Sequence, residues 1–155
     1  MTPAIKLACQ QKIIHQAHEY SHDPAAASYG LEAAEKLGVP AEQVFKTLVA
    51  EVDGKSLVVA VLPVSHQLSL KKLARAAGAK KAVMADPARV ERTTGYVLGG
   101  VSPLGQKKRL ATYIDASAEV QQQVYVSAGK RGLEISLTPQ DLQRLTQAAF
   151  ADLTD

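Results

Sequence analysis

The stretch VFKTLVAEVDGKSLVVAVL, residues 44–62, decides the fold of this chain. Its two apolar runs, Val44–Val52 and Ser56–Leu62, flank Asp53-Gly54-Lys55. A short turn containing Asp-Gly between two such runs is typical of an antiparallel β-hairpin. Lys46 interrupts the first run. A lysine there either places its charged end in water at the end of the strand, or points into a pocket that uses the charge.

Further helices and strands are expected on both sides of this hairpin. Helices are predicted where apolar residues recur at helical spacing beside capping residues, and strands where short apolar runs lie between glycines and prolines. Strands outnumber helices, so we predict an α/β fold: a mixed, mostly antiparallel, barrel-like sheet with flanking helices, within one domain over residues 1–155. The expected helices are 3–11, 29–37, 68–77, 86–92 and one after Thr138-Pro139 with Leu142, Leu145, Ala149 and Leu153 on one stripe; the expected further strands are 13–20, 96–98, 112–114, 124–126 and 133–137.

Composition narrows the class of protein. The chain has 155 residues, of which 46% are hydrophobic and 21% charged, as in a single soluble domain. The one cysteine, Cys9, excludes a disulfide framework and a cysteine-rich zinc cluster. No apolar run approaches the ~20 residues of a membrane helix, and the N-terminus does not resemble an export signal. We therefore expect a cytoplasmic protein with no membrane partner.

The charge is unevenly distributed along the chain. Residues 71–131 hold twelve Lys or Arg against four acids, whereas the rest of the chain holds six against eleven. This asymmetry indicates one basic face that attracts a polyanion such as nucleic acid. The alternative is a scatter of solvated lysines.

Two motif matches are rejected. His18-Glu19-Tyr20-Ser21-His22 matches the zinc signature H-E-x-x-H, but this chemistry needs a helix, and Pro24 makes one improbable. Gly100–Lys107 nearly matches a phosphate loop, but Gln106 stands where the motif requires lysine. We therefore predict neither a metal site nor a nucleotide triphosphatase.

Two loops combine glycines with cations. Gly95, Gly99, Gly100 and Gly105 allow close approach of the backbone to a ligand, and Lys107-Lys108-Arg109 follows them. The second loop, Ser127–Gly132, contains Lys130 and Arg131. The pattern favours an anionic, phosphate-bearing ligand; otherwise these are β-turns whose lysines face water. No G-x-S-x-G elbow is present, and Cys9 lies in an expected helix.

Several segments together resemble the YbaK/EbsC family, the bacterial aminoacyl-tRNA deacylases related to the editing domain of prolyl-tRNA synthetase. The resemblance covers essentially the whole chain, and within the family the sequence is most similar to the members that clear cysteine from tRNA for proline. The segments that carry it are Thr2-Pro3-Ala4, Val44-Phe45-Lys46-Thr47-Leu48, Thr94-Gly95-Tyr96, Gly99-Gly100-Val101-Ser102-Pro103-Leu104-Gly105-Gln106-Lys107-Lys108-Arg109 and Tyr125-Val126-Ser127-Ala128-Gly129-Lys130-Arg131-Gly132-Leu133.

The resemblance implies a barrel-like sheet with flanking helices and assigns roles to residues. Lys46 matches the family's functional lysine and is the expected catalytic residue. No cofactor or metal is implied, and the expected partners are aminoacyl-tRNA, prolyl-tRNA synthetase and cysteinyl-tRNA synthetase. The expected substrate-binding residues are Tyr20, Tyr29, Thr47, Gly99, Gly100, Ser102, Ser127, Gly129 and Glu134, and the expected nucleic-acid contacts are Lys107, Lys108, Arg109, Lys130 and Arg131.

The resemblance also implies a reaction, in which the thiol of a misacylated cysteine attacks its own ester and leaves as a thiolactone. Cys-tRNA for proline, and also Cys-tRNA for cysteine, are the expected substrates. The alternatives are a deacylase that uses water on alanyl or seryl esters, and a catalytically silent tRNA-binding module. Two residues depart from the family pattern: Ala128 replaces a glycine and Glu134 replaces an aspartate, which puts the amino-acid preference in question.

Overall fold

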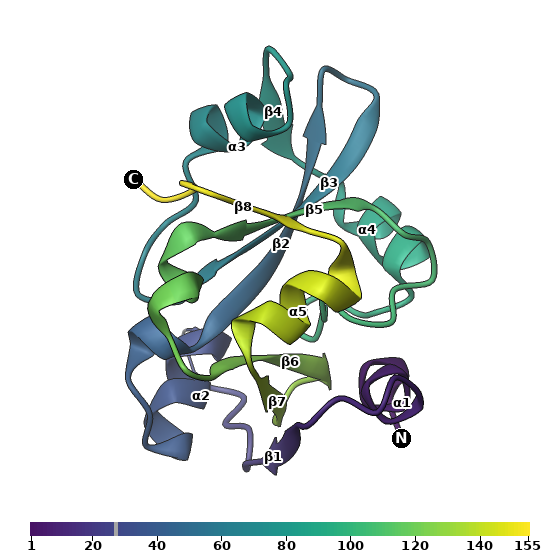
Figure 1. Ribbon diagram of the computed structural model, residues 1–155. Helices are drawn as coiled ribbons and strands as arrows, with labels where there is room; N and C mark the ends of the chain where they lie inside the picture. Colours follow the sequence, from purple (N-terminus) through teal and green to yellow (C-terminus); the bar gives the residue numbers. More distant parts are fainter. Residues whose placement is uncertain (27) are drawn as a thin grey trace.

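A computed structural model describes residues 1–26 and 28–155 (Figure 1). Within these residues the helices are short, and the strands fall into two sheets. The helices are α1 (Pro3–Gln10), α2 (Tyr29–Leu37), α3 (Leu70–Ala76), α4 (Pro87–Thr94), α5 (Pro139–Thr146) and the 3-10 turns η1 (Ala41–Gln43) and η2 (Ala116–Val120). The strands are β1 (Gln16–Glu19), β2 (Phe45–Val52), β3 (Ser56–Pro63), β4 (Ala82–Met84), β5 (Ala111–Asp115), β6 (Val124–Lys130), β7 (Leu133–Leu137) and β8 (Ala149–Ala151).

The hairpin predicted from residues 44–62 is confirmed as β2 and β3. The two strands pair antiparallel from Phe45 opposite Pro63 to Val52 opposite Ser56. Asp53 and Gly54 make the turn with φ of 52° and 66°, the left-handed region that glycine and aspartate adopt most readily. Strand β3 is central in its sheet and buried on both faces, which explains its unbroken apolar run.

The predicted mixed, mostly antiparallel arrangement is also confirmed. The larger sheet has the order β4-β2-β3-β5-β8, and the smaller sheet has the order β1-β7-β6. Only the β3–β5 and β5–β8 pairs are parallel among the described strands. A parallel bridge between Val44 and Tyr125 joins the two sheets. Figure 1 shows the smaller sheet below the larger one, with α5 running in front between them; no ladder closes the described strands into a complete ring.

The N-terminal strand is shorter than the predicted 13–20. Strand β1 covers only Gln16–Glu19, because those four residues are the ones that face partners on β7, from Ser136 to Leu133. Ile13 packs into the main core, and Ile14 lies in solvent. Ile13 and Ile14 therefore precede the strand, and Ile13 anchors this segment in the core.

The predicted strand 96–98 is wrong. Tyr96 follows the glycine that ends α4, and its ring is buried in the core. Its hydroxyl donates a hydrogen bond of 2.6 Å to the Leu104 carbonyl, which closes the loop after α4 over the core. A short apolar run after a glycine is equally typical of a strand and of a loop that is anchored by a buried aromatic ring. The sequence pattern therefore did not distinguish these two structures.

The final helix is also shorter than its predicted stripe. Leu142 and Leu145 lie on α5, but the helix ends at Thr146, and Gln147 takes a left-handed φ of 54°. Ala149 then pairs with Tyr113 as part of β8, and Leu153 is buried against α3 in a different cluster from Leu142. Strand β4, which was not predicted, adds to the free edge of β2. No helix in the described part of the chain is long and apolar enough to cross a membrane.

Candidate active site

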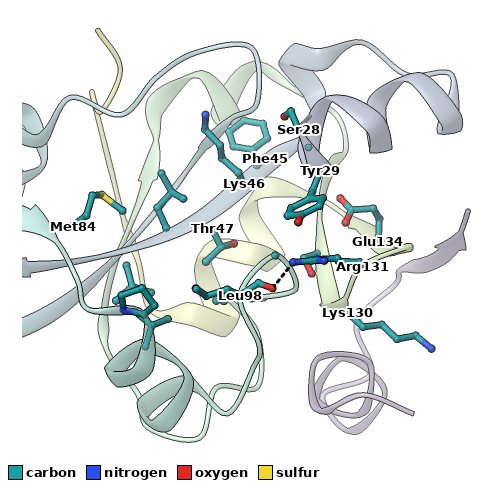
Figure 2. Close-up of a pocket in the computed structure, with 18 of the residues that line it drawn as sticks. Ser28, Tyr29, Phe45, Lys46, Thr47, Met84, Leu98, Lys130, Arg131 and Glu134 are labelled. Carbon is teal, nitrogen blue, oxygen red and sulfur yellow. Dashed lines mark hydrogen bonds between the residues drawn. The ribbon is translucent and has the colours of Figure 1, made fainter. Parts of the chain in front are cut away.

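A cavity of about 560 Å³ lies beside the open edge of β2. One edge of β2 pairs with β3 along its whole length. The other edge is joined to β6 by a bridge at Val44, just before β2 begins, and to residues 82–85 from Val49 onward, where the Ala85 N–H donates to the Val49 carbonyl at 3.1 Å. The residues between these two contacts, 45–48, line the cavity together with Val49 (Figure 2). The site therefore sits where the two sheets separate.

Most of the residues expected at the site do line this cavity. They come from β1's end, α2, β2, the loop after α4, β6 and β7, so the fold gathers segments that lie more than 100 residues apart. The expected residues found in the lining are Lys46, Tyr20, Tyr29, Thr47, Gly99, Ser127, Glu134, Lys130 and Arg131.

Lys46 is held on the cavity wall by its place in β2. Its side chain is half-buried, and burial lowers the pKa of its amine below the usual value. In Figure 2 the amine extends along the wall past Phe45. Lys46 therefore belongs to the cavity lining while its side chain stays partly exposed, and both possibilities left by the sequence stay open.

Glu134 is a buried acid on the opposite wall. It lies on β7, is 7% exposed, and forms no ion pair or hydrogen bond with the residues that the structure describes. Burial raises the pKa of its carboxyl to about 8, so at neutral pH the group is mostly protonated. The pKa of the neighbouring Tyr20 hydroxyl is raised, first by burial and then by the charge of Glu134. Cations therefore dominate the charge of the cavity at neutral pH.

Arg131 connects two walls at the mouth of the cavity. Its guanidinium carbon lies 4.0 Å from the centre of the Tyr29 ring, and its Nη2 donates to the Leu98 carbonyl at 3.2 Å. Gly99 makes room for this contact, because a Cβ there would fall 2.4 Å from Arg131 Nε. Gly100 likewise packs on the backbone of Lys130. The two glycine-and-cation loops predicted from the sequence thus meet at one place.

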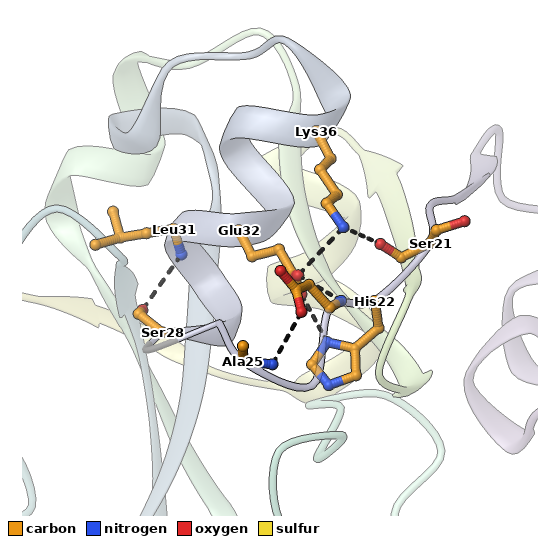
Figure 3. A network of polar contacts seen from close by, with 8 residues as sticks. Ser21, His22, Ala25, Ser28, Leu31, Glu32 and Lys36 are labelled. Atoms are coloured by element: carbon orange, nitrogen blue, oxygen red, sulfur yellow. Dashed lines mark hydrogen bonds and ion pairs between the residues drawn. The ribbon is translucent and has the colours of Figure 1, made fainter.

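A polar network behind Tyr29 fixes its helix to the preceding loop (Figure 3). The buried Glu32 carboxylate accepts hydrogen bonds from His22 Nδ1 and from the Asp23 backbone N–H, both at 2.7 Å, and pairs with Lys36 Nζ at 3.3 Å. These contacts, the one with His22 foremost, lower the pKa of Glu32 to about 2. The His22 ring meets the Tyr29 ring edge-on at 5.4 Å. Sequence reasoning missed this network, because its only signal was His22 in a rejected zinc motif.

The hydroxyl groups of the cavity form no nucleophile–base pair within the described residues. Ser28 and Ser127 accept hydrogen bonds from the backbone N–H groups of Leu31 and Gly129. Thr47 Oγ1 is buried and has no partner among the residues described. The described residues of the cavity therefore include no hydroxyl paired with a base.

Three expected substrate-binding residues do not line the cavity. Ser102 is fully buried, and its Oγ accepts from the Leu104 N–H, so it holds a turn. Gly129 forms a bulge in β6 with φ of 111°, pressed against Tyr96. Gly100 supports the mouth from behind. Their role in binding substrate stays a prediction, since in a glycine-rich loop close packing against the protein and close approach to a ligand leave the same sequence pattern.

The basic run 107–109 lies in solvent, away from the cavity lining. Arg109 borders a second, smaller hollow of about 170 Å³ with Leu7 and Leu145. The two histidines of the H-E-x-x-H match have separate partners: His18 Nε2 lies 2.8 Å from Ser136 Oγ, and His22 binds Glu32. The described residues contain no group of three or more His, Cys, Asp or Glu placed to hold a metal ion.

Comparison with known proteins places the chain in one family. Residues 23–145 match the model of the aminoacyl-tRNA editing domain. The chain is 41% identical to EbsC of Enterococcus faecalis, named as a candidate Cys-tRNA(Pro)/Cys-tRNA(Cys) deacylase, over 99% of this chain and 93% of that protein. It is 31% identical to the uncharacterised protein YwhH of Bacillus subtilis over 74% of this chain and 73% of that one. A crystal structure of a candidate trans-editing enzyme for prolyl-tRNA synthetase superposes with a TM-score of 0.84 at 26% identity, covering 100% and 99% of the two chains.

Proposed function

This chain belongs to the aminoacyl-tRNA editing domain family, and on that premise we propose that it removes cysteine from tRNA for proline and also from Cys-tRNA for cysteine. The observation that carries the proposal is Lys46 on the wall of a cavity that holds no paired protein nucleophile among its described residues. A cytoplasmic site of action follows from where aminoacyl-tRNA is made and used.

Lys46 is proposed to stabilise the negative charge that develops on the ester carbonyl oxygen. An ammonium group that is half removed from water interacts more strongly with such a charge than a solvated one. The lowered pKa of Lys46 reflects the same partial burial. Because Glu134 is mostly neutral at pH 7, it does not cancel the charge of Lys46.

The substrate's own thiol is the proposed nucleophile. A cysteine thiol with a pKa near 8.5 is roughly a few per cent thiolate at neutral pH and strongly nucleophilic. After the thiol gives its proton to solvent, the sulfur bonds to the carbonyl carbon. The ester C–O bond then breaks, and its electron pair stays on the ribose oxygen, which takes a proton. The products are free tRNA and a thiolactone, and the ester itself supplies the proximity that the reaction needs.

Selection of the tRNA is proposed to come from a synthetase partner. The chain presents one small cavity and a few cations at its mouth, Lys130 and Arg131, which bind phosphate without reading sequence. Prolyl-tRNA synthetase, and also cysteinyl-tRNA synthetase, are the proposed partners, because each handles one of the proposed substrates.

The test is release of labelled cysteine from Cys-tRNA for proline, with Ser-tRNA for proline as the second substrate. We expect the wild type to cleave the cysteinyl ester alone. Lys46→Ala should lose about 10²-fold or more in rate, the effect of removing one group that stabilises an oxyanion. Lys55→Ala, which removes an exposed lysine from the hairpin turn, is the matched control and should keep full activity.

Two outcomes would contradict the proposal. Equal cleavage of the seryl ester would exclude the thiol mechanism and favour a deacylase that uses water. Binding of tRNA without cleavage of either ester would leave a catalytically silent RNA-binding module.

A further inference from the structure

Arg131 is kept in place by two contacts, since its side chain is exposed and forms no ion pair within the described residues. The guanidinium carbon lies 4.0 Å from the centre of the Tyr29 ring, and Nη2 donates to the Leu98 carbonyl (Figure 2). An exposed arginine side chain has many rotamers, so these contacts decide where the charge lies. The position of the Tyr29 ring therefore matters for Arg131.

The Tyr29 ring is contacted in turn by the ring of His22. Tyr29 is the first residue of α2, where the backbone N–H has no partner within the helix. The two rings meet edge to face, with their centroids 5.4 Å apart and their planes at 65°. Such packing restricts the rotation of the tyrosine ring. His22 thus limits the positions open to the ring that carries the guanidinium.

A buried carboxylate sets the orientation of His22 (Figure 3). His22 Nδ1 lies 2.7 Å from Glu32 Oε1, and only 5% of the Glu32 side chain is exposed. A carboxylate accepts hydrogen bonds and does not donate them, so Nδ1 carries the proton. The other carboxylate oxygen is held by the Asp23 N–H and by Lys36 Nζ. Because Glu32 and Tyr29 belong to the same helix, α2 both orients the His22 ring and carries the ring on which it packs.

The loop that contains His22 is also bound to the turn that contains Arg131. The Tyr20 N–H donates to the Gly132 carbonyl at 2.9 Å. A Cβ on Gly132 would lie 2.8 Å from the Tyr20 carbonyl oxygen and 3.9 Å from the His22 Cβ. The loop with His22 therefore contacts both α2 and the turn with Arg131.

We propose that His22 is a positioning residue for RNA binding: through the Tyr29 ring, it holds the Arg131 guanidinium where it meets a phosphate of the substrate. The inference rests on the proposed function, in which Arg131 binds phosphate. A guanidinium that is held in place before binding loses less conformational freedom when it pairs with phosphate, so the complex is tighter. His22 is not part of the cavity lining, so its effect passes through these contacts.

The test separates the ring of His22 from its hydrogen bond. His22→Asn keeps a side-chain N–H that donates to Glu32 but removes the ring from Tyr29. The values of kcat and KM are measured separately for Cys-tRNA for proline, which carries phosphates, and for cysteinyl-adenosine, which carries none. His66→Asn, which replaces an exposed histidine outside the cavity lining, is the matched control.

We expect His22→Asn to raise KM for the tRNA about 2- to 5-fold, the size of one exposed cation–π contact, and to leave kcat unchanged. KM for cysteinyl-adenosine should stay at the value of the wild type, and His66→Asn should change neither KM. In an Arg131→Ala background, His22→Asn should have no further effect, because the group that it positions is gone.

Three results would overturn the proposal: an unchanged KM for the tRNA, an equal rise in KM for both substrates, or the same rise in the Arg131→Ala background. If His22→Asn does not fold, Tyr29→Leu removes the ring and leaves the Glu32 network intact, and the same comparison with Arg131→Ala applies. If the wild type cleaves neither ester, the proposed function fails, and the affinity of these variants for uncharged tRNA still tests the role of His22.

Discussion

Replacing Glu134 by glutamine should stabilise the protein, and the gain should grow with pH. The carboxyl has no compensating partner among the described residues, and burial raises its pKa from 4.5 to about 8. A group whose folded pKa is raised contributes no penalty below its unfolded pKa, and its penalty grows as the pH rises toward the folded pKa. The loss of stability therefore begins near pH 4.5 and is complete above pH 8.

The size of the effect follows from that difference in pKa. At pH 7 the unfolded carboxyl is ionised while the folded one is mostly protonated, which costs about 3 kcal/mol relative to glutamine; at pH 9 the cost reaches about 5 kcal/mol. Glutamine has almost the same volume and is neutral at every pH, so Glu134→Gln should remove this cost.

The assay is urea unfolding of the wild type and Glu134→Gln at pH 4, 7 and 9. The two proteins should have similar free energies of unfolding at pH 4 and diverge as the pH rises. Glu119→Gln removes an exposed acid from η2 and should show no such divergence. A difference for Glu134→Gln that does not change with pH would refute the reasoning, because it would mean that the folded carboxyl keeps an ordinary pKa.

Two further predictions concern stability. Gly129→Ala should lower the free energy of unfolding by about 2–4 kcal/mol, because the residue has φ of 111° and its Cβ would lie 2.7 Å from Tyr96 Cε1. Gly54→Ala is the control: its φ is 66° but the space around it is open, so it should cost only about 1 kcal/mol. Equal losses of the two variants in thermal unfolding would contradict this explanation. Glu32→Gln should remove an acid-sensitive contribution, because the lowered pKa of Glu32, about 2, gives stability that is present above pH 4.5 and lost as the pH falls toward 2. Acid unfolding followed by circular dichroism should therefore be less steep in the variant between pH 4.5 and 2, and an unchanged acid transition would disprove the role of this carboxylate.

The hairpin was predictable because its signals are local. An apolar run, a turn with Asp-Gly and a second apolar run fix the pairing of β2 and β3 through residues that are neighbours in the chain. The starts of two helices were predictable for the same reason, since Asp86 and Thr138 cap the first turns of α4 and α5 with their own side chains. Strand β8 was not, because it depends on an edge that β5 offers from elsewhere in the sequence.

The sequence also singled out Lys46, as a charge inside an apolar strand, and the cation loops, as glycines beside lysine and arginine. By itself the sequence determined that a hairpin carries a lysine, and it favoured anion binding at two loops. Only the tertiary structure decided that, among the described residues, this edge of β2 has no strand partner between Val44 and Val49, so that Lys46 lines a cavity. Only the fold brought Arg131 onto Tyr29 and left Glu134 buried without a partner. The physical reason is that burial and charge environment depend on contacts between segments distant in the chain, and local sequence patterns do not encode these contacts.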